Sequence, residues 1–456
     1  MIRLALTFDD VCKLAGFLDR ARPNETGAFL LVSEMRTHLG LRIVARDLIL
    51  PDDSAWVVAE RHRLVPSGQL ISQVVSRAVE ENAGVLFVHS HPDSGHPTEF
   101  SSVDDEALRQ LSVALEDLID GPFVAAVVGP RGWVARRYHG PDWDPIDRVT
   151  AAGRGVRVLD PSPNPPDHAA LFDDRQQLAL GELNTRLRNL DVAVVGCGGL
   201  GSPLAETLTR MGVRRLTLMD PDRLDTPSNI SRVLGRRRRT WRLRNKATVV
   251  ANHCRSIGMR TDVEAVPEDV RTEAAFQRLL DHDVVFSATD THSSRAVMNV
   301  LSYAFHLTVI DGGCRIGCTP AGLAGLLSEV RIIGPGLPCL LCRGTLDPGT
   351  IRAELLPELD RTALEREGYI IGSSAGPVPS AAALTVLGAG MMASTLLAYL
   401  SSHSEVLSGG YVVDALMEDV PRRSLRDRCL DECIVVRSEG LGWQAPLGAI
   451  PPSSSS

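Results

Sequence analysis

The chain lacks any run of about 18 uninterrupted apolar residues, so the sequence predicts no membrane span. It also lacks an excess of positive charge: 48 Lys and Arg stand against 56 Asp and Glu, and the net charge of -8 offers no general attraction for nucleic acid or an anionic membrane. Residues 1–10 lack the apolar length of a secretory signal, and we therefore expect a cytoplasmic protein. Nine cysteines, an odd number in a long chain, do not indicate a disulfide framework.

What the sequence does contain is the pattern of globular α/β domains. Of its 456 residues, 44% are hydrophobic and 23% are charged. Short strand-like runs at 27–32, 41–44 and 84–88 alternate with helical runs at 8–19 and 67–80. This alternation predicts a small α/β domain at the N-terminal end.

A second domain begins further along the chain. A strand at 191–195, a glycine-rich turn, a helix at 202–211 and a strand at 216–219 form one βαβ unit, which predicts a Rossmann-like domain with a mainly parallel sheet. The intervening region loses periodicity and includes a proline-rich stretch, which favours a linker. We expect a first domain at 1–140, a linker at 141–172, a second domain at 173–437 and a disordered tail at 438–456.

Two histidines and a carboxylate predict a metal site in the first domain. His89 and His91 follow a buried strand two residues apart, so both imidazoles can point the same way and reach one ion. Asp104 could be the third protein ligand, which leaves the fourth position of a zinc ion for water. Glu25, just before another strand, could take a proton from that water.

These residues resemble the JAMM/MPN (JAB) metalloprotease family, whose pattern is a Glu, then His-Ser/Thr-His-Pro, six residues, Ser, two residues and Asp. The resemblance covers about residues 1–140 and implies these roles: general base Glu25, catalytic zinc ligands His89, His91 and Asp104, and oxyanion donor Ser101. Here eight residues separate Pro92 from Ser101, so a small loop insertion is expected, and Asp105 is a possible substitute for Asp104.

A glycine-rich turn predicts a nucleotide site in the second domain. The turn at 196–202 follows a buried strand and opens a helix, so its backbone can approach phosphates at the helix N-terminus. Asp220, at the end of the next strand, sits where an acid binds ribose in dinucleotide folds, which also allows a nicotinamide oxidoreductase. Polar and charged residues downstream instead favour ATP, because charge on departing pyrophosphate must be neutralised: Asp222, Asn229, Arg232, Lys246 and Asp290.

About residues 173–437 resemble the ThiF/MoeB-type activating enzymes, which adenylate the C-terminal glycine of ubiquitin-like proteins. The resemblance implies these roles: phosphate loop Gly196, Gly198, Gly199 and Gly201, ribose contact Asp220, phosphate contacts Asn229, Arg232 and Lys246, with Asp222 beside them, and Mg²⁺ ligand Asp290. Arg232, Lys246 and Asp290 would thus be catalytic. Arg175 looks like an arginine that reaches the partner subunit's ATP site in that family, which implies a homodimer.

The cysteines divide into two close pairs and several single residues. Cys339, Cys342, Cys429 and Cys433 have the spacing of a structural four-thiolate zinc site. Where the family's usual thioester cysteine would stand, residues 372–376 read Gly-Ser-Ser-Ala-Gly. Either the reaction stops at the acyl-adenylate, or Cys314 or Cys318 serves. Cys197 is expected to be a small buried side chain.

By resemblance, both domains act at the C-terminus of one small β-grasp protein, of the ubiquitin-like or sulfur-carrier type. We expect a bifunctional enzyme that uses zinc to trim or deconjugate this partner, and ATP with Mg²⁺ to adenylate its terminal glycine. Two alternatives stay open: sulfur-carrier activation for cofactor or metabolite biosynthesis, and a non-catalytic platform that binds the ubiquitin-like protein.

Overall fold

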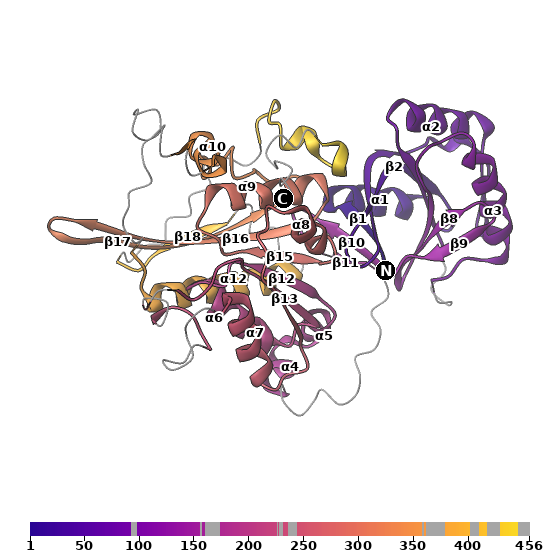
Figure 1. Ribbon diagram of the computed structural model, residues 1–456. Coiled ribbons are helices and arrows are strands. Elements are labelled where there is room, and N and C mark those ends of the chain that lie inside the picture. Colours follow the sequence, from indigo (N-terminus) through magenta and orange to yellow (C-terminus); the bar gives the residue numbers. More distant parts are fainter. Residues whose placement is uncertain are drawn as a thin grey trace. The chain divides into compact units, whose positions relative to one another are not determined.

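The chain folds as two compact units. The computed structural model describes residues 1–92, 98–155, 157–159, 174–225, 227, 231–235, 244–357, 360–361, 379–401, 410–416 and 429–445. The first unit spans residues 1–163 and takes in 303–306 and 438–445, and the remaining residues belong to the second. Figure 1 shows a separate sheet with its own helices in each unit.

A nine-stranded sheet forms the centre of the first unit, in the order β11-β10-β1-β3-β2-β6-β7-β8-β9. Its strands are β1 (Ile2–Thr7), β2 (Gly27–Arg36), β3 (Leu41–Ile49), β6 (Gly84–Ser90), β7 (Phe123–Gly129), β8 (Gly132–His139), β9 (Asp142–Pro145), β10 (Arg148–Ala152) and β11 (Arg157–Val158). The helices are α1 (Phe8–Arg20), α2 (Gly68–Glu80) and α3 (Ser102–Glu116), and η1 (Asp53–Ala55) precedes a small hairpin of β4 (Trp56–Glu60) and β5 (Arg63–Pro66).

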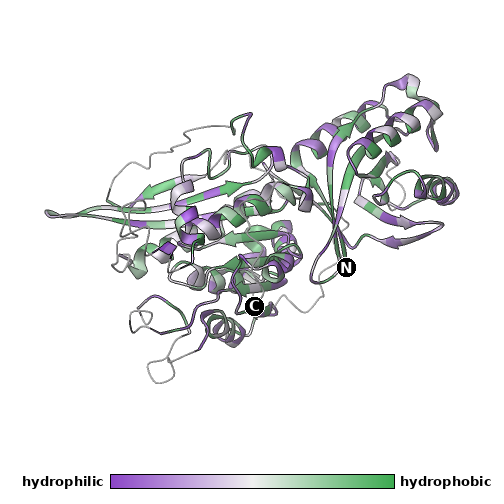
Figure 2. Cartoon of the chain, turned by 45° about the horizontal axis from the view of Figure 1, so that its top comes forward, coloured by the Kyte–Doolittle hydropathy of each residue, from purple (hydrophilic) through white to green (hydrophobic). Residues whose placement is uncertain are grey.

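Both faces of this sheet are covered. Leu30 belongs to the core on the side of α1, whereas its neighbours Phe29 and Leu31 belong to the core under α2 and α3. This is the alternation that a strand imposes on successive side chains. Figure 2 accordingly colours the central strands largely as hydrophobic.

The boundary expected at residue 140 is wrong. β10 pairs in parallel with β1, with Arg3 opposite Arg148, and all five of its residues are buried. β9 pairs with β8. A short strand covered on both faces shows no alternation of polar and apolar residues, so its sequence lacks the usual periodic signal. The proline-rich stretch 161–166 lies outside the described residues.

The tail expected from residue 438 also begins too early. The short 3-10 helix η5 (Val436–Ser438) ends at the expected boundary, a second one, η6 (Gly442–Gln444), follows it, and Ser438 and Ala445 are buried. Residues 446–456 lie outside the described part of the chain.

The second unit has a seven-stranded sheet in the order β14-β13-β12-β15-β16-β17-β18. Its strands are β12 (Asp191–Val195), β13 (Arg215–Met219), β14 (Asp262–Val266), β15 (Val284–Ser287), β16 (Thr308–Thr319), β17 (Gly322–Ile333) and β18 (Tyr411–Asp414). Its helices are α4 (Asp174–Leu180), α5 (Glu182–Arg188), α6 (Gly201–Met211), α7 (Lys246–Ser256), α8 (Glu273–Leu279), α9 (His292–Ala304), α10 (Pro348–Leu355) and α12 (Ala382–Leu400).

The strand order confirms a Rossmann-like unit. The first five strands along the sheet run parallel, whereas β17 and β18 are antiparallel additions. The chain leaves β12 on one side toward β13 and returns on its other side at β15. In such sheets ligands bind outside the carboxyl ends of the strands at this reversal point.

The helix α12 is long and apolar enough to cross a membrane by length and composition alone. However, 61% of its apolar window is buried inside the protein. It packs against α6, β16 and β17. These contacts give α12 the environment of a core helix in the second unit.

Candidate functional site

The two histidines and Asp104 come together at the end of β6. His89 pairs across the sheet with Gly27 of β2, and Ser90 N donates to Thr26 O at 2.9 Å, which places the chain around Glu25 beside the histidines. Asp104 lies in the first turn of α3. Its two carboxylate oxygens are 3.2 Å from His89 Nε2 and 3.3 Å from His91 Nε2.

This donor set fits a zinc ion. The potential ligand atoms of His89, His91 and Asp104 all lie within 4.8 Å of one another. The side chain of His89 is only 2% exposed, and among the described residues neither of its ring nitrogens has a partner in hydrogen-bond geometry, although Nε2 lies close to Asp104. Because buried polar atoms rarely lack a hydrogen bond, this buried imidazole points to a further ligand. Two imidazoles and one carboxylate leave one tetrahedral position open, as in catalytic zinc sites.

The electrostatics keep Asp104 ionised. Burial alone would raise the pKa of its carboxyl group, but His89, His91 and the hydroxyl of Ser101 hold that pKa well below its usual range. The pKa of His91 is raised: burial lowers it, and the nearby charges of Asp104 and Glu25 more than offset that effect. Glu25 is buried, and its Oε1 lies 3.8 Å from His91 Nε2.

Ser101 and Asp105 flank Asp104 and behave differently. Ser101 caps α3: its hydroxyl donates to Asp104 Oδ2 at 2.7 Å, and Asp104 N donates back to Ser101 Oγ at 3.1 Å. Asp105 forms an ion pair with Arg136 and is half exposed. The structure therefore brings Asp104, and not its alternative Asp105, to the histidines. The loop insertion expected after Pro92 includes residues 93–97, which are not described.

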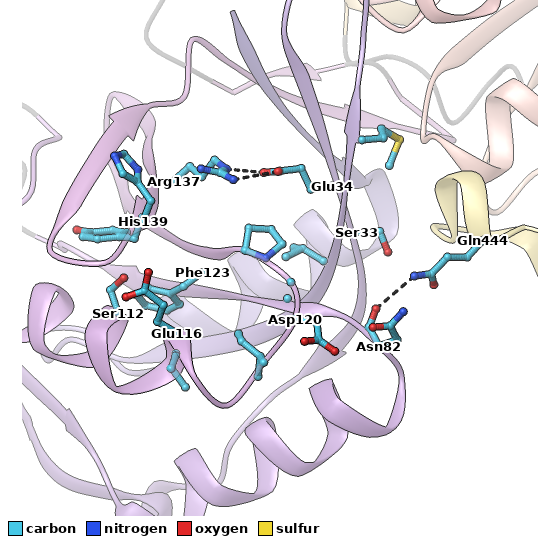
Figure 3. Close-up of a pocket in the computed structure, with 18 of the residues that line it drawn as sticks. Ser33, Glu34, Asn82, Ser112, Glu116, Asp120, Phe123, Arg137, His139 and Gln444 are labelled. Atoms are coloured by element: carbon cyan, nitrogen blue, oxygen red, sulfur yellow. Dashed lines mark hydrogen bonds and ion pairs between the residues drawn. The ribbon is translucent and has the colours of Figure 1, made fainter. Parts of the chain in front are cut away.

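A cavity of about 480 Å³ in the first unit lies elsewhere. Gly84 at the start of β6 lines it, whereas the histidines stand at the other end of that strand. Figure 3 shows the ion pair between Glu34 and Arg137 at its wall and the carboxylates of Glu116 and Asp120 around it. None of the residues predicted from the sequence to be functional lines this cavity.

In the second unit, two glycines allow the tight turn between β12 and α6. Gly196 has φ of +94°, and a Cβ there would lie 2.6 Å from Ala288 O. A Cβ at Gly201 would lie 1.7 Å from Gly196 O. Any larger residue at either position would force the loop apart, so the close approach of strand and helix requires glycine.

The other two glycines face different surroundings. A Cβ at Gly198 would meet open space, whereas one at Gly199 would contact the side chains of Arg232 and Thr385. Buried Ser202, which the sequence reasoning missed, fixes this arrangement: its hydroxyl contacts Gly198 O at 2.8 Å and Arg232 O at 3.3 Å. The loop therefore has open space at Gly198, where phosphates would enter, and is packed against the Arg232 side chain at Gly199.

Asp220, Asp222, Lys246 and Asp290 gather beside this loop. Asp220 accepts hydrogen bonds from Cys197 N at 2.7 Å and Asp222 N at 2.9 Å, so it braces the turn, and burial raises its pKa. Lys246 Nζ donates to Asp222 Oδ2 at 2.7 Å. Burial lowers the pKa of Lys246, but the contact with Asp222 and the charges of Asp220, Asp222 and Asp290 raise it overall. Lys246 therefore stays cationic, and exposed Asp290 is open to a divalent cation such as Mg²⁺.

Of the two remaining predicted residues, Arg175 lies apart from the loop, and Asn229 is outside the described residues. Arg175 is exposed on α4, whose next residue Gln176 donates to Met211 O at the far end of α6 from the glycines. The structure therefore does not bring Arg175 to the phosphate loop of its own chain.

The four paired cysteines form a second cluster. Their sulfur atoms lie within 4.8 Å of one another. Backbone amides point at the sulfurs: Cys339 N donates to Cys429 Sγ at 3.0 Å and Cys342 N to Cys339 Sγ at 3.4 Å. Buried Asn299 of α9 accepts from Leu340 N at 3.0 Å and holds the first pair in place. Four thiolates in this arrangement fit a closed, structural zinc site.

Burial raises the pKa of the thiol in two of the single cysteines that the resemblance or the glycine loop singles out. Cys197 is fully buried, and burial raises its pKa, as it does for Cys314 of β16. Cys318 is exposed near the tip of the β16–β17 hairpin. A raised thiol pKa disfavours the nucleophilic thiolate. Residues 372–376 lie outside the described part.

The fold and the loop define a nucleotide-binding Rossmann-like protein. Residues 174–432 match the ThiF family, and the chain belongs to that family. Ubiquitin-like modifier-activating enzyme 5 of Drosophila sechellia is 26% identical over 312 residues, which cover 65% of this chain and 68% of that protein. Adenylyltransferase and sulfurtransferase MOCS3 of Sus scrofa is 34% identical over 162 residues, which cover 33% and 34%. A structure of E. coli MccB with MccA-N7isoASN is 15% identical, with a TM-score of 0.47, and covers 59% of this chain and 75% of that one.

Proposed function

We propose that the second unit adenylates the C-terminal glycine of a ubiquitin-like or sulfur-carrier protein. The observation that carries this proposal is the cluster of Lys246, Asp222 and Asp290 beside a glycine loop that is open at Gly198. An NAD site would not need a cation and exposed carboxylates there. The ThiF membership and the names of the relatives support the same chemistry.

The reaction divides among these residues. The terminal carboxylate attacks the α-phosphorus of ATP, the bond to the bridging oxygen breaks, and pyrophosphate leaves with its electron pair. Lys246 and Arg232 neutralise charge on the phosphates, while the loop amides and the N-terminus of α6 face them. Asp290 holds Mg²⁺, which neutralises phosphate charge when bound. Asp220 is the ribose contact, because each of its oxygens retains a second lone pair.

ATP–pyrophosphate exchange tests this proposal. The wild type, incubated with purified β-grasp proteins that end in Gly-Gly, is expected to exchange label, and Asp290→Ala is expected to lose at least about 100-fold. Asp262→Ala is the matched control, because this exposed residue starts β14 at the opposite edge of the sheet. Binding of NAD in place of ATP, or equal exchange by Asp290→Ala, would contradict the proposal.

We further propose that the protein works as a homodimer, in which the exposed Arg175 of one chain reaches the phosphate loop of the other. The position of Arg175 supports this proposal. It lies on α4, which contacts the end of α6 that is far from the glycine loop, so Arg175 does not serve the loop of its own chain. Sedimentation should give a dimer. Arg175→Ala and Asp290→Ala should each be inactive alone. Mixing them should restore exchange, because a heterodimer contains one site that combines Asp290 of the first chain with Arg175 of the second.

We propose a second activity for the first unit: a zinc-dependent peptidase of the JAMM/MPN type that trims or deconjugates the same partner. The supporting observation is the open three-ligand cluster with buried Glu25 beside it. Zinc, when bound, lowers the pKa of water and polarises a carbonyl. Glu25 would take the proton of the attacking water and pass it to the leaving amine. The hydroxyl of Ser101 would turn from Asp104 toward the oxyanion.

A fusion of a β-grasp protein to a short peptide after its Gly-Gly end tests the peptidase. Mass spectrometry should show loss of the tail with wild type and a fall of at least about 100-fold with Glu25→Ala. Asp120→Ala, at the other end of the sheet, is the control with unchanged cleavage. An intact tail with zinc-loaded wild type would overturn this activity and leave the adenylation proposal standing.

The acceptor of the activated glycine follows from the cysteines. The sequence has no cysteine at 372–376, and burial raises the pKa of the Cys314 thiol. These observations favour a reaction that ends at the acyl-adenylate. A sulfur donor could then attack the acyl-adenylate, which would make sulfur-carrier activation the second candidate function. The name of the Sus scrofa relative, an adenylyltransferase and sulfurtransferase, agrees with this candidate.

A further inference from the structure

A stacked arginine stands directly behind the histidine cluster. The guanidinium carbon of Arg136 on β8 lies 4.2 Å from the ring centre of Phe100 and 3.9 Å from that of Trp143 on β9. Its side chain is 15% exposed and forms an ion pair with Asp105. The rings and Asp105 already hold this guanidinium, so it is not free to bind a substrate carboxylate.

The stack reaches the ligands by two routes. The ring of Phe100 meets that of His89 edge-on, with centroids 6.2 Å apart, and the His89 ring meets that of His91 at 5.1 Å. Through Asp105, Arg136 also contacts the first turn of α3, where Asp104 is the preceding residue. One cation is thus connected to every member of the proposed zinc site.

The connection between β6 and α3 explains why such an anchor is needed. Eight residues separate Pro92 from Ser101 in the sequence, two more than in the family pattern, so a longer connection joins Asp104 to the histidines. A longer connection leaves more conformations to be fixed. Phe100 is its last residue and is buried between Arg136 and His89. Packing at Phe100 therefore sets where α3 begins.

Charge adds a second role. Asp104 and Asp105 are adjacent carboxylates, and either could approach a metal ion. Arg136 pairs with Asp105, so that of these two adjacent carboxylates Asp104 is the one that contacts the histidines. Residues that orient ligands in this way contribute strongly to metal affinity.

We propose that Arg136 is a positioning residue of the zinc site: held between Phe100 and Trp143, it fixes Phe100 against His89 and withdraws Asp105, leaving Asp104 as the sole carboxylate ligand. This proposal rests on the zinc site of the proposed peptidase. It concerns metal affinity and geometry, so it can be tested without any substrate.

Zinc dissociation constants of the full chain, measured by chelator competition, test the proposal. Asp104→Ala identifies the zinc of the histidine site, because that variant should lose it and keep the four-cysteine zinc. Arg136→Met is expected to weaken the histidine site about 10–100-fold, and Arg136→Lys, which retains charge but not the planar stack, less than that. The control is Arg137→Met: its side chain, on the opposite face of β8, pairs with Glu34, and affinity should stay within about threefold.

Two further measurements separate positioning from folding. The metal-free variants should melt within a few degrees of wild type, while the visible absorption of Co²⁺ in the histidine site should shift for Arg136→Met. If Arg136→Met fails to fold, Trp143→Leu removes the exposed ring of the stack and should weaken zinc about 3–10-fold. Unchanged zinc affinity in both variants would overturn the proposal. A wild type with no zinc sensitive to Asp104→Ala would instead overturn the peptidase site itself.

Discussion

The four-cysteine cluster and the histidine cluster are built from the same kind of sequence pattern but differ in what surrounds them. Each joins a close pair of ligands to residues far along the chain. Around the cysteines, four sulfurs face one another and backbone amides point at them. Around His89 and His91, the described residues offer one further potential ligand, Asp104, and the buried carboxylate of Glu25 lies beside them.

Under the proposed functions, this difference separates a stabilising metal site from a reactive one. Four protein ligands fill a tetrahedron and leave no position for substrate or water, whereas three ligands leave one. A proton acceptor next to the open position is useful only if chemistry occurs there. We therefore expect loss of the cysteine cluster to affect folding and loss of the histidine cluster to affect function.

The largest effect should follow from breaking the closed cluster. Cys339→Ser removes a buried ligand, and because structural zinc contributes about 10 kcal/mol or more to folding in small domains, we expect the second unit to melt at least 10 °C lower. Calorimetry with zinc analysis would measure it. Cys318→Ser, at an exposed position, should melt as wild type. Full zinc content and normal melting of Cys339→Ser would show that this cluster is not a metal site.

Asp104→Ala should affect zinc binding at the histidine cluster rather than the stability of the fold. Zinc affinity at the histidines should fall at least about 100-fold, since one of three ligands is gone, while the melting temperature of the metal-free protein changes little. Asp105→Ala is the sharper comparison, because it should keep the zinc with at most about 10-fold weaker binding. Equal zinc loss in the two variants would contradict the assignment of Asp104 as the ligand.

Two glycines of the nucleotide loop offer a similar comparison, because one is tightly packed and the other faces open space. Gly201→Ala places a Cβ 1.7 Å from Gly196 O and should destabilise the second unit by about 2 kcal/mol or more. Gly198→Ala meets open space, so it should leave stability unchanged but weaken ATP binding about 10-fold, because the methyl group enters the phosphate position. Denaturant melts and ATP titration would measure both. Tight ATP binding by Gly198→Ala would place the phosphates elsewhere.

The smallest effect concerns support of the cysteine cluster. Asn299→Ala leaves the buried amide of Leu340 without its acceptor, which should cost about 1–3 kcal/mol in the free energy of unfolding. Zinc should remain bound, because all four sulfurs are intact. Urea denaturation of Asn299→Ala would show the loss, and an unchanged midpoint would mean that water replaces the amide oxygen.

Close spacing in the sequence was enough to predict both clusters. The His-x-His pair follows a strand, and the two cysteine pairs have the spacing of zinc ligands, so local geometry already brings each pair together. Asp104 and Glu25 were proposed as ligand and base from their residue types and places in the sequence, the family resemblance gave them the same roles, and the structure places both beside the histidines.

Residues that act through tertiary packing escaped the sequence reasoning. Arg136 and Ser202 carry no local signal, because their partners Phe100, Asp105 and Arg232 come from other elements. The strand β10 was taken for linker because its five residues are covered on both faces. Its position is set by pairing with β1, which is adjacent in the sheet but about 140 residues earlier in the sequence, and the local pattern of residues does not encode that pairing.

The most direct test of the whole account combines the two proposed activities in one tube. A β-grasp protein with a short peptide after its Gly-Gly end is incubated with zinc-loaded enzyme, ATP, Mg²⁺ and labelled pyrophosphate, and both the tail and the exchange are followed. We expect wild type to remove the tail and then exchange label, and Glu25→Ala to do neither with this substrate but to exchange normally with the trimmed protein. Exchange on the untrimmed protein without loss of its tail would contradict the account.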